Sequence, residues 1–159
     1  MKNKLYLMCG KMASGKSTLS KKLAKENNAI LLSEDEILKK LYPNEIKTIE
    51  DYIKYSSRLK NMLREHIIEL LKKENSVVLD FPANTINQRD WFKKIIEEAN
   101  IEHEMFYVKR SDEICKNQLK KRNENLSKDE PLIDEATFDA ITKYFQEPND
   151  NEDFNIIYC

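Results

Sequence analysis

Short runs of apolar residues alternate along this chain with longer segments in which apolar residues recur every three or four positions. The short runs, such as residues 5–9, are typical of strands buried on both faces, as in a parallel sheet. The longer segments are typical of amphipathic helices, whose apolar residues share one face. The pattern predicts strands at 5–9, 29–32, 76–80, 105–108 and 154–158, and helices at 17–26, 34–42, 48–73, 85–99, 112–122 and 134–145.

Several of these helix starts carry side chains that can cap the free N–H groups of a first turn. Segments 33–36 and 85–88 have the spacing of a capping box, and Asp51 follows Thr48 at the same distance. Pro43 closes the second helix, because the residue before a proline avoids the helical conformation. The alternation of strands and helices predicts a three-layer α/β fold, in which a five-stranded parallel sheet carries helices on both faces.

The two glycines of the chain both lie between the first predicted strand and the first predicted helix. The segment Gly10-Lys11-Met12-Ala13-Ser14-Gly15-Lys16-Ser17 matches the phosphate-binding pattern G-x-x-x-x-G-K-[ST], the Walker A motif, in the strand-to-helix context that the motif requires. Glycine is needed there because the loop wraps its N–H groups around an anion and leaves no space for Cβ. We expect this loop and the following Thr18 to bind the phosphates of a nucleotide.

Two side chains of the loop have expected roles of their own. Lys16 should reach the β- and γ-phosphates, and the hydroxyl of Ser17 should bind Mg²⁺. Other nucleotide-handling designs are excluded, since two glycines cannot supply the three of a Rossmann fingerprint. The D-x-x-G and N-K-x-D strings of GTPases that resemble Ras are also absent. Turns elsewhere should rely on Pro and Asn, because Asn tolerates turn conformations better than most residues.

Charge and cysteine usage narrow the expected surroundings of the protein. With 27 Lys and Arg against 28 Asp and Glu, the net charge is −1, which argues against binding to nucleic acid or to an anionic membrane. The three cysteines are odd in number and show no C-x-x-C spacing, which fits a reducing cytoplasm better than a framework of disulfides. No segment reaches the roughly 18 apolar residues of a membrane span. We expect a cytoplasmic protein, and its oligomeric state stays open.

Asp80 is the carboxylate that ends the third predicted strand. Ligands of parallel α/β sheets bind at the carboxyl ends of the strands, so Asp80 should emerge beside the phosphate loop. There it could hold Mg²⁺ through water. The alternative is a carboxylate that only caps a turn at the strand end.

Asp35 follows the second predicted strand, at the rim where a phosphate acceptor would sit. A carboxylate there can accept the proton of an acceptor hydroxyl and orient its oxygen. The alternative is structural, because acidic residues in a first helical turn also interact favourably with the helix dipole. For the neighbouring Glu34 and Glu36 we expect mainly such capping roles.

Arginine is scarce here, with five among the basic residues, and its planar group grips phosphate in ways that lysine cannot. Arg122 precedes a polar stretch, 123–131, that could form a small lid. Arg122 could clamp phosphate or stack on a base, or it could simply complement a helix C-terminus. Arg89 stands in a first helical turn, which disfavours a cation and therefore hints at an anionic partner. Arg58 is a further candidate for substrate contact, although a solvated role is the simpler interpretation.

The chain resembles the small P-loop kinases that include chloramphenicol phosphotransferase, zeta-type toxin kinases and the kinase half of polynucleotide kinases. Many members of this group are described as AAA-family ATP-binding proteins or kinases. The resemblance implies ATP-dependent phosphorylation of a hydroxyl, with Asp35 as the counterpart of the catalytic aspartate and Arg122 of a lid arginine. It is carried by the loop at 10–17, by 32–37 and 77–80, and by 112–115, 119–123, 138, 144–145 and 152–154.

The leading hypothesis from the sequence is a single P-loop kinase domain over 1–159. It would use ATP and Mg²⁺ to phosphorylate a small molecule, with Lys16, Asp35 and Arg122 as catalytic residues. One alternative is an ATP-binding or ATPase module that phosphorylates no acceptor. Another is a kinase for the 5′-hydroxyl end of a polynucleotide, against which the lack of basic excess argues. The identity of the acceptor is not encoded in any motif of this chain.

Overall fold

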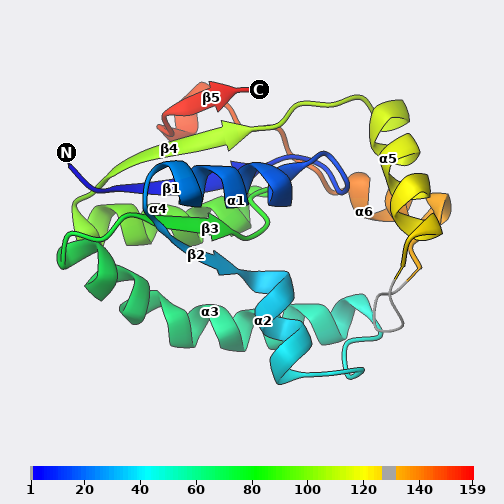
Figure 1. The fold of residues 1–159 in the computed structure, drawn as a ribbon, viewed down its shortest axis with the longest axis horizontal. Coiled ribbons are helices and arrows are strands. Elements are labelled where there is room, and N and C mark those ends of the chain that lie inside the picture. Colours follow the sequence, from blue (N-terminus) through cyan, green and yellow to red (C-terminus); the bar gives the residue numbers. More distant parts are fainter. Residues whose placement is uncertain (1, 127–131) are drawn as a thin grey trace.

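A computed structural model describes residues 2–126 and 132–159. Its centre is a five-stranded sheet in the order β2-β3-β1-β4-β5 (Figure 1), and every neighbouring pair is parallel. This confirms the predicted α/β fold. The strands are β1 (Lys4–Cys9), β2 (Ile30–Ser33), β3 (Val77–Asp80), β4 (Glu102–Tyr107) and β5 (Ile156–Tyr158).

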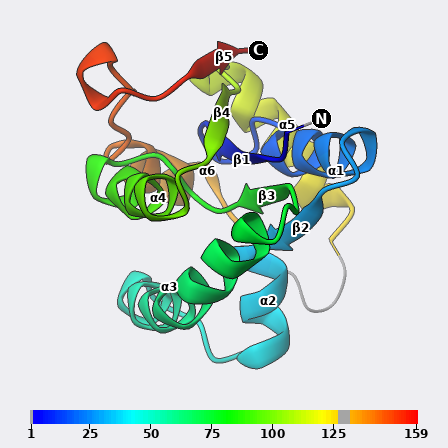
Figure 2. The same cartoon turned by 90° about the vertical axis from the view of Figure 1, so that its left-hand side faces the viewer.

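Helices cover both faces of the sheet. Figure 2 shows α1 on one side and α3 and α4 on the other. None of the helices in the described part of the chain combines the length and the apolar character that crossing a membrane requires. The helices are α1 (Lys16–Glu26), α2 (Glu34–Leu41), α3 (Ile49–Lys72), α4 (Ile86–Ala99), α5 (Asp112–Glu124) and α6 (Glu135–Thr142), with a 3-10 turn, η1, at Asp150–Glu152.

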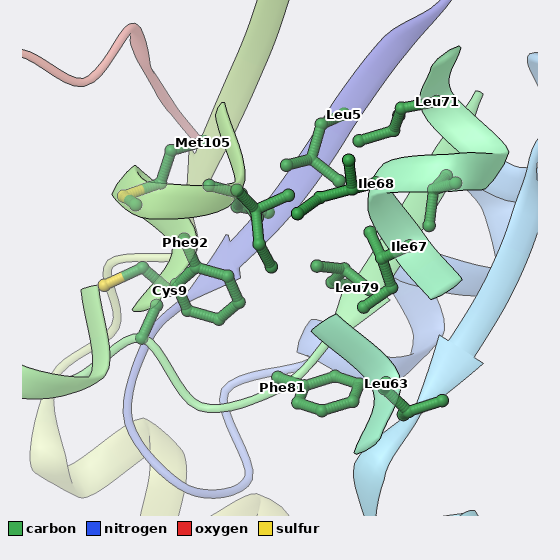
Figure 3. Packing of buried hydrophobic residues seen from close by; sticks show 14 of the residues in the cluster. Leu5, Cys9, Leu63, Ile67, Ile68, Leu71, Leu79, Phe81, Phe92 and Met105 are labelled. Atoms are coloured by element: carbon green, nitrogen blue, oxygen red, sulfur yellow. The ribbon is translucent and has the colours of Figure 1, made fainter. Parts of the chain in front are cut away.

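The alternating residues of β1 build two separate cores. Leu5, Leu7 and Cys9 are fully buried against α3 and α4, where they join Ile67 and Phe92 (Figure 3). Tyr6 and Met8 point the other way and pack with Leu23 of α1. Because side chains alternate between the faces of a strand, this continuous apolar run is buried on both sides.

Most predicted elements occur where the pattern placed them, with differences at their ends. β4 begins at Glu102, three residues earlier than predicted, because its polar first half also pairs with β1, with Glu102 opposite Lys4. Lys4 forms an ion pair with Glu104 at 2.8 Å. The last helix ends at Thr142 instead of 145. The capping box of Thr48 and Asp51 is present in full.

The other two capping predictions are wrong in part. Ser33 is the N-cap of α2, but its side chain makes no capping bond. It is still the last residue of β2, paired with Asp80, so the strand passes directly into the helix. Thr85 does accept a bond from the Gln88 backbone, whereas the Gln88 side chain accepts from Asn84 instead of returning to Thr85.

Turns outside the phosphate loop are made without glycine. Asn28, Asn44 and Asn100 all have positive φ, at 49°, 60° and 49°. Asparagine reaches this region more easily than most residues. The predicted use of Asn is confirmed at these three turns, whereas Glu74 and Asp153 have positive φ, at 64° and 60°, at two others. Both glycines remain in the loop between β1 and α1.

Candidate nucleotide-binding site

The loop between β1 and α1 has the backbone that a phosphate-binding loop needs. Gly10 has a φ of 152° and Gly15 a φ of 102°, both unfavourable for residues with a side chain. A Cβ on Gly10 would lie 2.8 Å from Ser14 Oγ and 2.8 Å from the carbonyl oxygen of Val108. The loop therefore excludes any side chain at Gly10, while Gly15 opens α1 in a left-handed conformation.

The side chain of Lys16 folds back over this loop. Its Nζ donates a hydrogen bond to the carbonyl oxygen of Gly10 at 2.6 Å. Burial lowers the pKa of Lys16 below its usual 10.5, because the ammonium has lost part of its hydration. The loop thus holds a cation that is poorly solvated and close to where a phosphate would bind.

Ser17 near the start of α1 meets Asp80, the last residue of β3, at the edge of the sheet where β1 and β3 end. The hydroxyl of Ser17 donates to Asp80 Oδ2 at 2.9 Å. Hydroxyl and carboxylate oxygens are the donors that Mg²⁺ accepts, and this ion keeps several waters and phosphate oxygens as further ligands. Among the described residues there is no group of three or more His, Cys, Asp or Glu side chains that could hold a metal by themselves. The pair therefore fits Mg²⁺ bound together with a nucleotide.

A pocket of about 450 Å³ opens beside the loop. It brings together residues that the sequence singled out from four elements: the phosphate loop, Asp80 at the end of β3, Asp35 on α2 and Arg122 on α5. The structure adds Lys21, Lys39 and Gln118, which lie one helical turn from Ser17, Asp35 and Arg122 respectively. Residues four apart on a helix share a face, and this spacing was the sequence signal by which they could have been predicted. The lining consists of Ala13, Ser14, Gly15, Lys16, Ser17, Thr18, Lys21, Leu31, Ser33, Asp35, Glu36, Lys39, Asp80, Gln118 and Arg122.

Asp35 stands at the rim of this pocket with its carboxylate in solvent. Its side chain is 74% exposed and forms an ion pair with Lys39 at 3.2 Å. Pairs of this kind, one turn apart on an exposed helix, contribute about 0.3–0.5 kcal/mol. A ligand group could therefore displace Lys39 at little energetic cost.

Glu34, next to Asp35, has a role that the sequence did not indicate. It is only 3% exposed, and its two carboxylate oxygens accept hydrogen bonds from the hydroxyls of Tyr52 and Ser56 on α3. Burial, and then the charge of Glu34, raises the pKa of Tyr52. The expected capping role of Glu34 is thus wrong: this carboxylate joins α2 to α3. Its partners lie 18 and 22 positions away, beyond the reach of local patterns.

Arg89 and Arg58 do not line the pocket. Arg89 is fully buried, with its Nε donating to Glu152 at 2.7 Å and its Nη1 to the carbonyl oxygen of Ala83 at 2.9 Å. The anionic partner inferred from its unfavourable helix position is therefore a residue of the same chain, which corrects the assignment of Arg89 to a substrate. Arg58 is exposed and lies 5.8 Å from the ring centre of Tyr55, in agreement with the simpler interpretation.

Arg122 lines the pocket from the last turn of α5, which continues two residues further, to Glu124. This end of α5 is tied to the chain before α6, because Nδ2 of the adjacent Asn123 donates to the carbonyl oxygen of Ile133 at 2.7 Å. Most of the predicted lid, 127–131, lies outside the described residues, so the lid stays a prediction.

Comparison with known proteins identifies the family and the fold of this chain. A family model described as an AAA domain matches residues 5–148. No curated protein sequence gave a match. Three similar solved structures are a sugar kinase from Janibacter sp., the APS kinase of Mycobacterium tuberculosis in complex with AMPPNP and APS, and Kti12 of Chaetomium thermophilum in complex with ADP-AlF3.

The likeness to these structures extends along whole chains at low identity. The sugar kinase is 15% identical, with 100% of this chain and 85% of that chain covered and a TM-score of 0.66. The APS kinase is 15% identical, with 99% and 88% covered and a TM-score of 0.60. Kti12 is 18% identical, with 98% and 88% covered and a TM-score of 0.68. Because the family model spans most of its length, the chain belongs to the AAA domain family, with the fold of the small P-loop kinases that it resembles.

Proposed function

We propose that this protein is a kinase that transfers the γ-phosphoryl group of ATP to a hydroxyl group of a small molecule. The observation that carries the proposal is that Lys16, the Ser17–Asp80 pair and the exposed carboxylate of Asp35 all line the same pocket. Transfer of a phosphoryl group needs positioned charges more than covalent chemistry, so few side chains are sufficient.

The phosphate end of the reaction belongs to the loop and α1. The backbone N–H groups of the loop and the positive end of the helix dipole favour an anion. Lys16 lies at this end, and its ammonium can leave the carbonyl oxygen of Gly10 for a phosphate oxygen. As a cation it stabilises negative charge that develops on the transferred group.

Ser17 and Asp80 would hold Mg²⁺, Asp80 through a water molecule. When bound, this ion neutralises charge on the β- and γ-phosphate oxygens. The likeness to proteins solved with ADP-AlF3 and AMPPNP supports a nucleotide as the ligand of this loop.

The acceptor end belongs to α2. The carboxylate of Asp35 would accept a hydrogen bond from the acceptor hydroxyl and then take its proton. The acceptor oxygen forms its bond to the γ-phosphorus while the bond from that phosphorus to the oxygen of the leaving ADP breaks. Lys39, now paired with Asp35, would be displaced by the hydroxyl, and Arg122 on α5 would bind phosphate oxygens.

The test is transfer of label from γ-labelled ATP to a panel of small hydroxyl compounds, to an oligonucleotide with a free 5′-hydroxyl, and to water alone. Labelling of a small molecule by the wild type, and none by Lys16→Ala, supports the proposal. Labelling of the oligonucleotide alone would identify a polynucleotide kinase. ATP binding without transfer to any acceptor would indicate a nucleotide-binding module and contradict the proposal.

A further inference from the structure

The first peptide group of the phosphate loop is held by a side chain from outside the loop. The N–H of Gly10 donates to Asn84 Oδ1 at 3.1 Å, and the carbonyl oxygen of Gly10 accepts from Lys16 Nζ at 2.6 Å. Gly10 has no side chain and a φ of 152°, so little within the residue restricts its rotation. The N–H and the carbonyl oxygen of Gly10 belong to different peptide groups, so the bonds from Asn84 and Lys16 together hold the conformation of this residue.

Asn84 lies between β3 and α4, and its own backbone is fixed on both sides. Its N–H donates to Gln88 Oε1 at 2.9 Å, and its carbonyl oxygen accepts from the backbone N–H of Gln146 at 2.8 Å. The preceding residue, Ala83, is buried, and its carbonyl oxygen is bound by Arg89. The Asn84 side chain thus reaches the phosphate loop from a firmly held backbone.

The orientation of the Asn84 amide follows from its partner. The N–H of Gly10 can only donate, so the oxygen of Asn84 and not its NH₂ group must face the loop. The thiol of Cys9 also points at this oxygen, at 3.8 Å. Asn84 is not among the residues that line the pocket, so it acts on the loop from behind. An aspartate at this position would keep an acceptor for Gly10, whereas an alanine would not.

We propose that Asn84 is a positioning residue for the phosphate loop. By holding the N–H of Gly10, it fixes the peptide group between Cys9 and Gly10, at which the loop leaves β1, and so maintains the loop conformation that surrounds a phosphate. Gln146 and Glu152 extend this support to the segment after α6, since Glu152 binds Arg89. The inference rests on the proposed function only in requiring that the loop binds a nucleotide, and it is independent of any acceptor.

Calorimetry with ADP and Mg²⁺ tests the effect on binding. Loss of one hydrogen bond to the backbone predicts that Asn84→Ala binds ADP about fivefold to tenfold more weakly than the wild type. Asn84→Asp should bind more tightly than Asn84→Ala. Asn75→Ala is the matched control, because Asn75 also bonds to a backbone group, the carbonyl oxygen of Leu70 at 3.1 Å, but lies before β3, at the other end of that strand. It should bind ADP as the wild type does.

The two glycines make the loop itself observable by NMR. Labelling with [¹⁵N]glycine gives one amide signal for Gly10 and one for Gly15, and carbonyl-labelled cysteine identifies Gly10, because only Gly10 follows a cysteine. In Asn84→Ala the hydrogen exchange of the Gly10 amide should accelerate about fivefold to tenfold, while the Gly15 amide keeps its rate. Asn84→Asp should restore the slow exchange, and Asn75→Ala should change neither signal.

The possible outcomes separate this inference from the proposed function. Weaker ADP binding with an unchanged Gly10 amide, or an altered Gly10 amide with unchanged binding, would overturn the positioning role. An Asn84→Asp variant as weak as Asn84→Ala would do the same. If these measurements agree with expectation but no acceptor is ever phosphorylated, the proposed function fails and the role of Asn84 stands. A wild type that binds no ADP would overturn both.

Discussion

The hydroxyl of Ser17 donates a hydrogen bond to Asp80 across 2.9 Å, which joins the start of α1 to the end of β3. The two residues lie 63 positions apart, yet β1 and β3 are neighbours in the sheet and end at the same edge. Each supplies one oxygen at the point where a Mg²⁺ ion would meet nucleotide phosphates.

Replacement of Asp80 should weaken the dependence of nucleotide binding on Mg²⁺. Asp80→Asn removes the negative charge that would orient water on the ion, and such outer contacts are worth about 10- to 100-fold in metal affinity. Calorimetry with ADP at increasing Mg²⁺ concentrations measures the loss. Asp139→Asn, which removes the exposed partner of Lys116 outside the loop and the pocket lining, serves as control and should titrate as the wild type. Equal Mg²⁺ dependence in all three proteins would rule out this assignment of Asp80.

Lys16 should make nucleotide binding sensitive to alkaline pH. Only its protonated form attracts phosphate, and burial lowers its pKa below 10.5 in the free protein. Affinity for ADP is therefore complete while the ammonium is present and falls as the pH rises through this lowered pKa. Isothermal titrations with ADP between neutral pH and pH 10.5 measure this loss of affinity. Lys16→Ala should bind about 10- to 100-fold more weakly at neutral pH and lose this pH dependence. A wild-type affinity that stays constant up to 10.5 contradicts the role of Lys16.

Asp35 should affect turnover and not nucleotide affinity. Asp35→Asn keeps the shape of the side chain but cannot take a proton, which predicts a turnover lower by about 10²- to 10⁴-fold. ATP affinity should stay within about twofold, since only group transfer requires the base. Label transfer and calorimetry separate the two effects. The neighbouring Glu36→Gln, also exposed on the same turn, should keep most of the turnover. Full activity of Asp35→Asn would leave the acceptor without an identified base.

Glu34 should contribute to stability more than its helix position suggests. Glu34→Ala leaves the hydroxyls of Tyr52 and Ser56 without their acceptor inside the protein, at a cost of about 2–3 kcal/mol. Tyr52→Phe removes one of the two bonds and should cost about 1–1.5 kcal/mol. Urea unfolding provides both values. If Glu34→Ala were as stable as the wild type, the carboxylate would not be joining α2 to α3.

Arg89 should likewise prove to be a structural residue. Arg89→Ala leaves Glu152 without the cation that binds it, and breaking a buried ion pair costs about 3–5 kcal/mol. By contrast, Arg64→Ala breaks an exposed pair with Glu98 and should cost below about 1 kcal/mol. Urea unfolding of both variants gives the comparison. A stable Arg89→Ala protein with a raised KM for its acceptor would restore the assignment of Arg89 to the substrate.

Local patterns predicted much of this protein because each depends on residues close together in the chain. The apolar run of β1 and the three- and four-residue spacing along α3 reflect periods of strand and helix that hold wherever the element lies. The phosphate loop is equally local, since its eight residues carry both the glycines and the lysine. Asp35 and Asp80 could be placed as well, because parallel strands end at a common edge of the sheet.

The pairing of buried polar groups was beyond the sequence. Nothing around Arg89 indicates Glu152, 63 positions away, and nothing around Asn84 indicates Gly10, 74 positions away. Glu34 carries the local signature of a capping residue, although its side chain binds α3.

By itself, the sequence determined the order of strands and helices, the parallel sheet and the loop that can surround a phosphate, since these follow from short-range periodicity and from the freedom of two glycines. Only the tertiary structure decided which charges, such as those of Glu34 and Arg89, are buried in the protein and which groups they bind. The reason is that a buried polar group must find a partner on whatever element packs against it. That neighbour is set by the assembly of the whole sheet.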